Sequence, residues 1–412
     1  MVGNSRRELA DCFATHLNKM EIGIVGKPNV GKSTFFKALT LADVEIKNFP
    51  FTTINANVGV GYVRVKCPCS ELNLKCNPQN SICIEHNRFI PVKLIDVAGL
   101  VPGAHLGKGL GNKFLDDLRR ADVLIHVVDI SGSTNEKGEN TENYDPENDI
   151  KFLEEEIDEW FFSILKKNWS KIERKIKYEG KNLVKEFTDV LSGLSISEGQ
   201  IKQSFKKLNF EEKGKTNFSD NELRELAITL RKISKPIIIS GNKIDLDKNE
   251  NFERLSEKYL IIPTCSEAEL ALRQAQLNNI IHYIPGDDDF KILPENINEK
   301  QKKALEFIKE KILRKYKSTG VQQCINTAVF NILKKIVVYP VENEYKLTDQ
   351  KGNVLPDAYL MPEGSTTLDL AYKVHSEIGE KFIGAIDCRT KKKVGKEYML
   401  KNNDIIKIIT GR

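Results

Sequence analysis

The sequence predicts an α/β fold with a mostly parallel sheet, followed by a smaller β-rich domain. Three short apolar runs that are typical of buried strands end at Val25, Ile95 and Ser240, and a polar motif containing glycine follows each of them. From about residue 335 the pattern changes to short strands and turns around one helix. Because the carboxyl ends of parallel strands lie at one edge of a sheet, the three motifs are expected to meet there.

The first motif fits the pattern G-x-x-x-x-G-K-[ST] and directly follows the strand at 21–25. Glycines in this pattern allow backbone N–H groups to point at the α- and β-phosphates of a nucleotide, while Lys32 supplies a positive charge to the β- and γ-phosphates. Ser33 offers a hydroxyl to Mg²⁺, and the helix that begins there directs its amino terminus at the same anion. The motif residues are Gly26, Lys27, Pro28, Asn29, Val30, Gly31, Lys32, Ser33 and Thr34.

The second motif, Asp96-Val-Ala-Gly99, supplies a carboxylate that can hold the magnesium through water and a glycine N–H that can meet a γ-phosphate. The third motif contains Asn242-Lys243-Ile-Asp245. A carboxylate at Asp245 accepts from the N1–H and exocyclic amino group of guanine, while Asn242 and Lys243 brace the base. Adenine has no N1–H to donate. The order of the motifs therefore predicts a P-loop NTPase G domain that binds GTP and GDP.

Two loops between these motifs carry further candidates. The stretch Asn48–Thr53 contains Thr53, which is expected to join Ser33 and Asp96 around Mg²⁺ when a triphosphate is bound. The stretch after Gly99 has four glycines within nine residues and includes His105, which predicts a loop rather than a helix.

Composition excludes a membrane-spanning protein and predicts a cytoplasmic one. No apolar run approaches the roughly 20 residues that a membrane span needs, and residues 1–19 lack the apolar core of a signal peptide, which favours a disordered extension. A net charge of +5, from 63 basic and 58 acidic residues, permits RNA binding without requiring it.

A cysteine-rich insertion is predicted between two strands, at residues 66–87. Four thiols within it could bind a structural Zn²⁺ ion, whereas the spacing is not that of a standard C-x₂-C pair, so free thiols are the alternative. Disulfides are not expected in a cytoplasmic chain. The four residues are Cys67, Cys69, Cys76 and Cys83.

A helical insertion is predicted after Asp145, because apolar residues recur from Ile150 to Ile164 at steps of three and four. Antiparallel helices, in the form of a coiled coil, fit the sequence to about Arg231. The run from Lys166 to Lys177 is basic and contains Trp169. It is predicted either to contact RNA or to be a solvated helix face.

The last 75 or so residues suit a β-grasp module, by the order of their elements. The expected strands are 336–341, 345–348, 382–387 and 405–409, with a helix at 366–380. A hairpin after Asp387 carries Arg389 and several lysines that could meet RNA phosphates or simply be solvated.

The chain resembles the Obg-like GTPases, most closely the archaeal-type members of the YchF branch. The resemblance is carried by the phosphate motif, by N-F-P-F-T-T at 48–53 and by D-V-A-G-L-V-P-G-A-H-L-G-K-G-L-G-N-K-F from Asp96, and it extends over nearly all of the chain from Met20. The segments Pro362–Thr366 and Ala385–Asp387 are similar to the TGS domain. The resemblance implies a translation switch that contacts the ribosome or structured RNA through the TGS domain and the basic helical insertion.

Two departures from the family pattern bear on the substrate. In the better-known bacterial and eukaryotic members the N-K-x-D motif is degenerate and ATP is preferred, whereas it is intact here, which favours GTP. The S-A element that supports guanine is replaced by Cys265-Ser266, whose contact with guanine O6 is expected through a backbone N–H. An ATPase of the same family, and an RNA or ribosome adaptor that is stabilised by nucleotide without significant turnover, are the alternatives.

Hydrolysis is expected to be slow, because Leu100 occupies the place where many GTPases have a water-orienting glutamine. Asn29 is at the position where similar P-N-x-G-K-S GTPases can bind K⁺ next to the phosphates, or it pins the loop. Gly99 and two histidines are the catalytic candidates. His105 is on the glycine-rich loop, and His126, in a predicted buried strand, matches a histidine linked to hydrolysis in the bacterial relatives.

The predicted domain order combines these segments. It is a disordered extension at 1–19, a G domain in two parts at 20–145 and 232–290, the cysteine-rich insertion at 66–87, the helical insertion at 146–231, a helical linker at 291–334 and the TGS domain at 335–412. The sequence predicts no oligomeric state.

Overall fold

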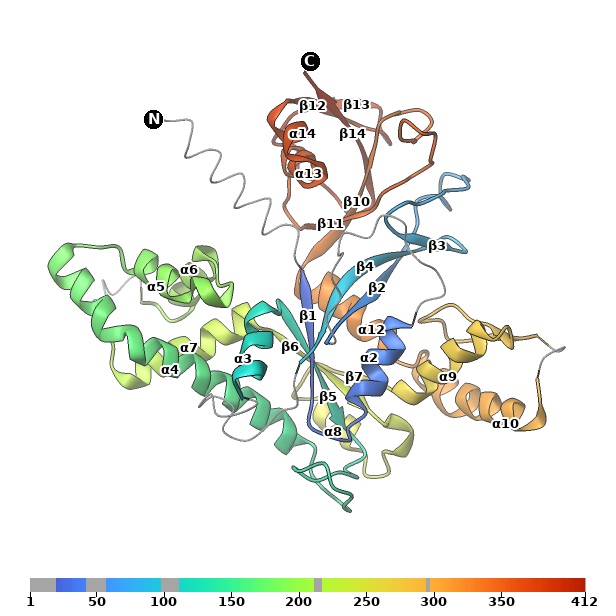
Figure 1. Cartoon of the computed structure of the whole chain (residues 1–412), viewed down its shortest axis with the longest axis horizontal. Helices are drawn as coiled ribbons and strands as arrows, with labels where there is room; N and C mark the ends of the chain where they lie inside the picture. The colour runs from blue at the N-terminus through green and yellow to red at the C-terminus, as the bar shows by residue number, and fades with distance from the viewer. Residues whose placement is uncertain (1–19, 42–56, 98–110, 211–216, 294–296, 412) are drawn as a thin grey trace. The chain divides into compact units, whose positions relative to one another are not determined.

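The computed structural model describes residues 20–41, 57–97, 111–210, 217–293 and 297–411. These residues form two compact units (Figure 1). The larger unit consists of residues 21–38 and 94–324, and the smaller unit contains residues 39–93 and 325–412. The predictions for Thr53, Gly99 and His105 lie outside the described residues.

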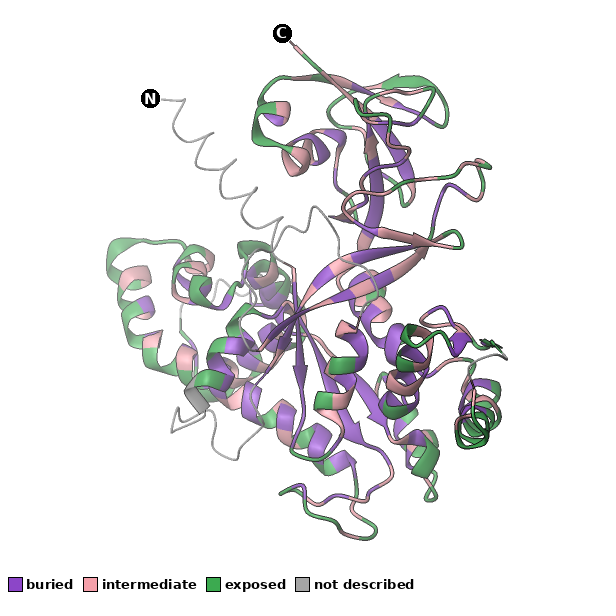
Figure 2. Ribbon diagram, turned by 45° about the vertical axis from the view of Figure 1, so that its right-hand side comes forward, coloured by how far each residue is buried: buried purple, intermediate pink, exposed green. Residues whose placement is uncertain are grey.

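The larger unit is organised by a parallel sheet, as the sequence predicts. Strands β1 (Glu21–Val25), β5 (Val123–Asp129), β6 (Ile237–Asn242) and β7 (Ile261–Pro263) lie in that order, and the end of β4 (Asn87–Asp96) is next to β1. Every residue of β1 and β5 is buried, as expected for strands covered on both faces. Figure 2 shows these central strands as purple throughout.

Helices and short segments connect and follow these strands along the chain, and those from residue 325 onward are in the smaller unit. The bounds are α2 (Lys32–Thr40), α3 (Gly111–Arg120), η3 (Ile244–Leu246), α8 (Asn251–Ser256), α9 (Ser266–Leu277), β8 (Ile281–His282), β9 (Lys291–Ile292), α10 (Glu299–Ile308), η5 (Lys309–Leu313), α11 (Arg314–Tyr316), α12 (Val321–Asn326) and η6 (Thr327–Ile332). Segments η5 and η6 are π-helical. None of the helices in the described ranges has both the length and the apolar character that a membrane span needs.

The helical insertion is a small bundle with an aromatic core. It contains α4 (Glu147–Glu179), α5 (Leu183–Leu191), η2 (Ser192–Leu194), α6 (Glu198–Lys207) and α7 (Asp220–Ser234). Trp169 of α4 stacks on Phe187 with ring centroids 6.1 Å apart and meets Phe218 edge-on at 5.0 Å. Phe205 of α6 and Leu223 of α7 belong to the same core, so four helices take part and the packing is broader than the predicted coiled coil. Capping boxes at Ser197 and Ser219 fix where α6 and α7 begin.

The smaller unit holds two sets of strands. Strand β2 (Val58–Lys66) neighbours β4, and β3 (Ile82–Ile84) is antiparallel to β4. A second sheet has the order β11-β10-β14-β12-β13, made by β10 (Lys335–Val341), β11 (Tyr359–Pro362), β12 (Phe382–Asp387), β13 (Lys392–Val394) and β14 (Asp404–Thr410). Helices α13 (Thr367–Val374) and α14 (Ser376–Glu380) accompany it, and Leu370 of α13 packs in its core.

Two expectations for this second sheet are wrong. The predicted strand at 345–348 is a turn, because Asn343 Oδ1 accepts from the N–H groups of Tyr345 and Lys346 and Leu347 has a positive φ of 56°. The predicted helix at 366–380 is two helices. His375 between them is extended, and its Nδ1 accepts from the N–H of Glu377 to cap the second.

Candidate nucleotide-binding site

The phosphate motif forms the turn between β1 and α2, where only glycine fits at one position. Gly31 has a φ of 92°, and a Cβ atom added there would lie 2.3 Å from Nδ2 of Asn242. Helix α2 begins at the next residue, Lys32, so its first N–H groups face the turn. The turn therefore has the backbone conformation and the helix terminus that bind phosphate.

The charged and hydroxyl groups of the predicted magnesium site lie on adjoining elements. Lys32 Nζ donates to Oδ1 of Asp96, the last residue of β4, and Ser33 is exposed in the first turn of α2. A hydroxyl and a carboxylate are oxygen ligands of the kind that Mg²⁺ prefers. The donors present in the described residues therefore fit a magnesium ion beside a bound phosphate.

Asn242 joins three segments of the site. Its Nδ2 donates to the carbonyl of Val30 at 2.8 Å, and its Oδ1 accepts from the N–H of Ser266 at 3.0 Å and from the Ser266 hydroxyl at 2.8 Å. Its side chain is 3% exposed. The amide thus joins the phosphate turn, the end of β6 and the start of α9, while Asp245 is exposed.

Lys243 forms an ion pair with Asp129, a residue that was not predicted to belong to the site. Its Nζ pairs with Oδ2 of Asp129 at 2.8 Å, and the same carboxylate accepts from the hydroxyls of Ser133 and Thr134. Asp129 is 1% exposed and is the last residue of β5. An aspartate at a strand end, followed by three hydroxyl residues in four positions, is the signal that could have indicated it.

The Cys265-Ser266 pair lies beside Asp245. The Cys265 thiol donates to Oδ1 of Asp245 at 3.2 Å. Both backbone N–H groups of the pair are in use, since Cys265 donates to the carbonyl of Thr319 and Ser266 donates to Asn242. The N–H expected for guanine O6 is therefore a later one in the first turn of α9.

A second loop covers the phosphate turn. Lys27 Nζ donates to the carbonyl of Thr134 at 2.8 Å and pairs with Asp149 Oδ2 at 2.7 Å, and the side chains of this pair are 5% and 8% exposed. Asn29 Nδ2 donates to the carbonyl of Gly138 at 2.9 Å. The ammonium group of Lys27 is therefore engaged within the protein, which leaves its backbone N–H to donate to a phosphate. The contact of Asn29 with Gly138 supports the alternative that Asn29 pins the loop.

His126 is buried in the middle of β5, one strand from the phosphate turn. It pairs in register with Val25 of β1 and Ile239 of β6, and its Nδ1 has no hydrogen-bond partner among the described residues. Burial, and then the positive charge of Lys27, lower the pKa of His126 to about 3. A neutral imidazole at this place can orient a neighbour but is a poor proton donor.

The lowered pKa of His126 predicts a loss of stability in weak acid. The unfolded chain binds a proton at His126 below its ordinary value near 6.5, whereas the folded chain does not until about 3. The free energy of unfolding should therefore fall as the pH falls through this window, by about 2 kcal/mol from pH 7 to pH 5. Urea unfolding, followed by fluorescence of Trp160 and Trp169, should show a pH dependence that is smaller by this amount in His126→Gln. Equal pH dependence in the two proteins would contradict the assignment.

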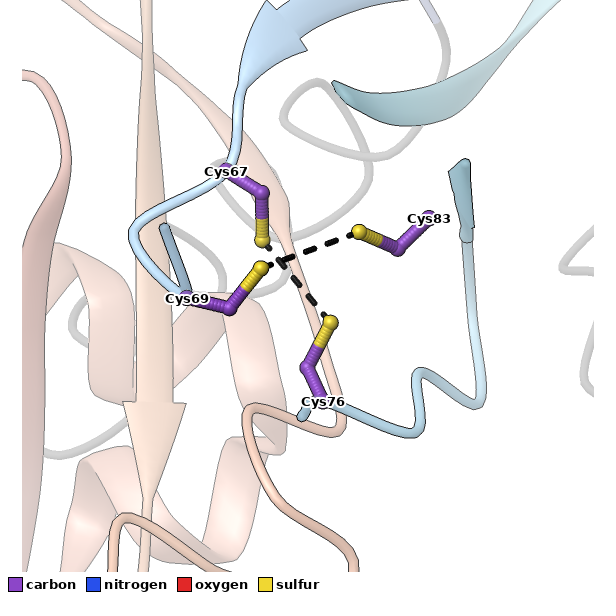
Figure 3. Close-up of side chains that lie close together, drawn as sticks. All are labelled: Cys67, Cys69, Cys76 and Cys83. Carbon is purple, nitrogen blue, oxygen red and sulfur yellow. Dashed lines mark hydrogen bonds between the residues drawn. The ribbon is translucent and has the colours of Figure 1, made fainter. Parts of the chain in front are cut away.

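The structure also brings the four cysteines of the insertion together. All four Sγ atoms lie within 4.8 Å of one another, and Figure 3 shows them pointing at a common centre. Cys67 and Cys69 are buried, while Cys76 and Cys83 are half-buried. The cluster belongs to the smaller unit and is compatible with a metal ion.

The basic end of α4 is less available than its composition indicates. Lys166 pairs with Asp220, Lys175 with Glu186 and Lys177 with Glu173. Trp169 is 9% exposed and belongs to the bundle core, so it is not a platform for stacking a base. The C-terminal hairpin differs, because Lys392 and Lys393 on β13 are exposed.

The parallel sheet, the phosphate turn and the base-recognition loop define a P-loop protein of the GTPase class. Three family patterns match in succession: "50S ribosome-binding GTPase" at residues 21–167, "Obg-like GTPase YGR210-like, G4 motif-containing domain" at 240–343 and "TGS domain" at 348–410. The chain belongs to the YGR210-like Obg-like GTPases with a C-terminal TGS domain.

Individual relatives agree with this assignment. The uncharacterized GTP-binding protein MJ1332 of Methanocaldococcus jannaschii is 55% identical over 394 residues, which cover 94% of this chain and 98% of that protein. The crystal structure of a GTP binding protein from Pyrococcus horikoshii has a TM-score of 0.77 and 42% identity, covering 95% of this chain and 100% of that one. The ribosome-binding ATPase YchF of Buchnera aphidicola is 29% identical over 406 residues, 93% of this chain and 97% of that protein.

Proposed function

We propose that this chain is a GTP-hydrolysing molecular switch that acts in translation, in the cytoplasm, at the ribosome or on structured RNA. One observation carries the choice of GTP. The amide of Asn242 joins the phosphate turn to the start of α9, and this leaves the Asp245 carboxylate exposed at the same edge of the sheet. Only a base with an N1–H and an exocyclic amino group, such as guanine, gives that carboxylate two donors.

The phosphate groups are bound by the turn and by the residues that follow it. The backbone from Gly26 to Gly31 donates N–H groups, and Lys32 supplies the charge. Ser33 and Thr53 would supply hydroxyl oxygens to Mg²⁺, and Asp96 would hold the ion through water. When bound, the ion neutralises charge on the β- and γ-phosphates. Lys32 then has a phosphate partner in addition to Asp96, so this ion pair is expected to loosen when a triphosphate binds.

Guanine is recognised at the carboxyl end of β6. Asp245 accepts from N1–H and from the exocyclic amino group, and Lys243, anchored on Asp129, lies along the base. The N–H of Glu267 in the first turn of α9 is the proposed donor to guanine O6, because first-turn N–H groups have no intrahelical acceptor and those of Cys265 and Ser266 are in use.

Turnover is proposed to be slow without an activator, because Leu100 cannot orient water. Gly99 is proposed as a donor to the γ-phosphate, and His126 and His105 as candidates for orienting the attacking water. The low pKa of His126 favours a neutral hydrogen-bonding role over proton transfer. K⁺ next to Asn29 is a further proposal for the charge that completes the site.

The partner is proposed from the family names. The family that matches residues 21–167 is described as a 50S ribosome-binding GTPase, and a related YchF protein is named a ribosome-binding ATPase. Exposed Lys392 and Lys393 on the TGS hairpin are the residues proposed to meet RNA phosphates. The basic end of α4 is a weaker candidate, since three of its lysines pair with carboxylates.

The base assignment is tested by changing Asp245 and the base together. In Asp245→Asn the side chain has one acceptor and one donor, which suits xanthine, with its carbonyl in place of the amino group. Calorimetric titration should show GDP affinity falling roughly 100-fold, as expected for the loss of a charge-assisted pair of hydrogen bonds, and xanthosine diphosphate affinity rising. ADP affinity should not change.

Wild-type protein titrated with ADP and ATP analogues gives the decisive control. Tighter guanine binding supports the GTP proposal. If adenine nucleotides bind as tightly as guanine nucleotides or more tightly, the GTP proposal is wrong and the chain is instead an ATPase. The Buchnera relative is named an ATPase.

A further inference from the structure

The cysteine-rich insertion has few apolar side chains to hold its shape. Leu72, Leu74, Ile82 and Ile84 are all half-buried, and residues 67–81 form turns and irregular backbone between β2 and β3. The two most buried apolar side chains at its start are those of Cys67 and Cys69, which are 0% and 1% exposed. The segment therefore needs a cross-link or a ligand in place of a core of its own.

The distances between the sulfur atoms fit a tetrahedral metal site and not disulfides. Cys67 Sγ lies 4.0 Å from Cys76 Sγ, and Cys69 Sγ lies 3.9 Å from Cys83 Sγ (Figure 3). Four thiolates at the usual Zn–S distance would be separated by about 3.8 Å along each edge of the tetrahedron. A disulfide needs about 2 Å between the two sulfur atoms.

Neighbouring groups suit a cluster of thiolates. Nδ1 of His86 lies 3.3 Å from Cys69 Sγ, within reach to donate to it. The backbone N–H of Leu74 donates to the carbonyl of Cys69, and that of Cys67 donates to the carbonyl of His86, so both ends of the insertion are fixed close to the cluster.

Arg88 supplies a buried positive charge beside the cluster. It is fully buried, and its hydrogen bonds go to the neutral hydroxyl of Ser81 at 3.0 Å and the neutral carbonyl of Leu355 at 2.9 Å. Among the described residues no carboxylate lies within ion-pair distance of its guanidinium. Four thiolates around Zn²⁺ carry a net charge of −2. The cluster with its ion would therefore be the negative group that compensates for the desolvation of the buried Arg88 guanidinium.

The insertion also runs along the C-terminal β domain within the smaller unit. The N–H groups of Asn77 and Gln79 donate to the carbonyls of Val354 and Pro356, at 3.1 and 2.7 Å. The side chain of Asn80 exchanges two hydrogen bonds with the backbone of Ala358. Residues 77–80 therefore pair with residues 354–358, and Cys76 and Cys83 lie on either side of this segment.

We propose that Cys67, Cys69, Cys76 and Cys83 bind one structural Zn²⁺ ion, and that this ion shapes residues 77–80 for their pairing with residues 354–358 of the TGS domain. Arg88 is a positioning residue that stabilises the charge of the site. The proposal is independent of the identity of the nucleotide.

The test measures metal content and local protection in the full-length protein. Protein purified in reducing buffer should contain one zinc ion per chain, released by a mercurial reagent. Replacement by Co²⁺ should give the thiolate-to-cobalt absorption of a tetrahedral site. After zinc is removed with a strong chelator, hydrogen exchange at the amides of Asn77, Gln79 and Ala358 should accelerate by about tenfold or more, with no change at Ile24 or Ile125 in the parallel sheet.

Variants separate metal binding from folding. The double change Cys76→Ser/Cys83→Ser should abolish zinc binding, and Cys388→Ser, a buried cysteine outside the cluster, should keep it. Arg88→Met should weaken zinc binding about 10- to 100-fold in competition with a chromogenic chelator, and Arg88→Lys should restore part of that loss. If the double variant does not fold, the wild-type zinc content and exchange data still decide. The proposal would be overturned if the reconstituted protein contained no zinc or contained iron instead. It would also be overturned if zinc removal did not change hydrogen exchange at Asn77, Gln79 and Ala358.

Discussion

Gly31→Ala should lower the affinity for GDP by roughly 1,000-fold or more, which corresponds to about 4 kcal/mol. The new methyl group would lie 2.3 Å from Nδ2 of Asn242, and Gly31 has a φ of 92° that L residues rarely adopt. Forcing an alanine into this conformation costs about 1–2 kcal/mol. Displacing Asn242 also breaks its bonds to Val30 and Ser266, each worth about 1 kcal/mol.

The measurement is calorimetric titration of the purified variant with GDP in Mg²⁺. Gly193→Ala is the matched control, because a Cβ at Gly193 meets nothing within 4 Å and should leave binding unchanged. Circular dichroism should show that both variants keep their helix content. If Gly31→Ala binds GDP within tenfold of wild type, the close approach of Asn242 to the phosphate turn is not the feature that shapes the site.

The site was predictable wherever its residues are close in sequence or lie at strand ends. Strand β1 was predicted with its correct bounds, and the motifs after Val25, Ile95 and β6 were expected to meet because parallel strands present their carboxyl ends at one edge. The nine-residue phosphate motif needs only local backbone geometry, so its spacing alone carries the prediction.

The parts that were missed depend on contacts between distant residues. The bonds from Lys27 and Asn29 to the loop at 131–146 join residues 107 and 109 positions apart, and no local pattern indicates that pairing. The bond from Asn242 to the carbonyl of Val30 was not predicted for the same reason, since the two residues are 212 positions apart. Trp169 was assigned to a basic surface because its charged neighbours are visible in the sequence, whereas its aromatic partners, Phe187 of α5 and Phe218 just before α7, are distant in the sequence.

Local competition explains the wrong strand in the C-terminal domain. The stretch around Tyr345 has the aromatic and β-branched composition of a strand. The Asn343 side chain, however, accepts hydrogen bonds from two of its backbone N–H groups, which are then not available for pairing with another strand. The strand β11 was missed because Leu360 and Met361 gave no alternation of apolar and polar residues. Its pairing with β10 at Ile336 and Val337 determines it instead.

Lys27→Met should destabilise the larger unit by about 3–5 kcal/mol, because it removes the cation from a buried ion pair. Asp149, 8% exposed, would lose its ammonium partner, and among the described residues the Tyr144 hydroxyl, at 3.0 Å, is the side-chain donor that remains. Urea unfolding at pH 7, followed by the fluorescence of Trp160 and Trp169, measures the free energy of unfolding of this unit, since both tryptophans lie in α4.

Two comparison variants identify the cause of that loss. Lys177→Met breaks an exposed pair with Glu173 and should cost less than about 1 kcal/mol. The double change Lys27→Met/Asp149→Leu removes both buried charges and should recover at least half of the loss, because an apolar pair avoids the desolvation of charge. If the double variant is as unstable as Lys27→Met, the unpaired carboxylate is not the cause. The loss would then come from the contacts of the Lys27 side chain with Thr134 and the Tyr144 ring, which hold the loop at 131–146 on the phosphate turn.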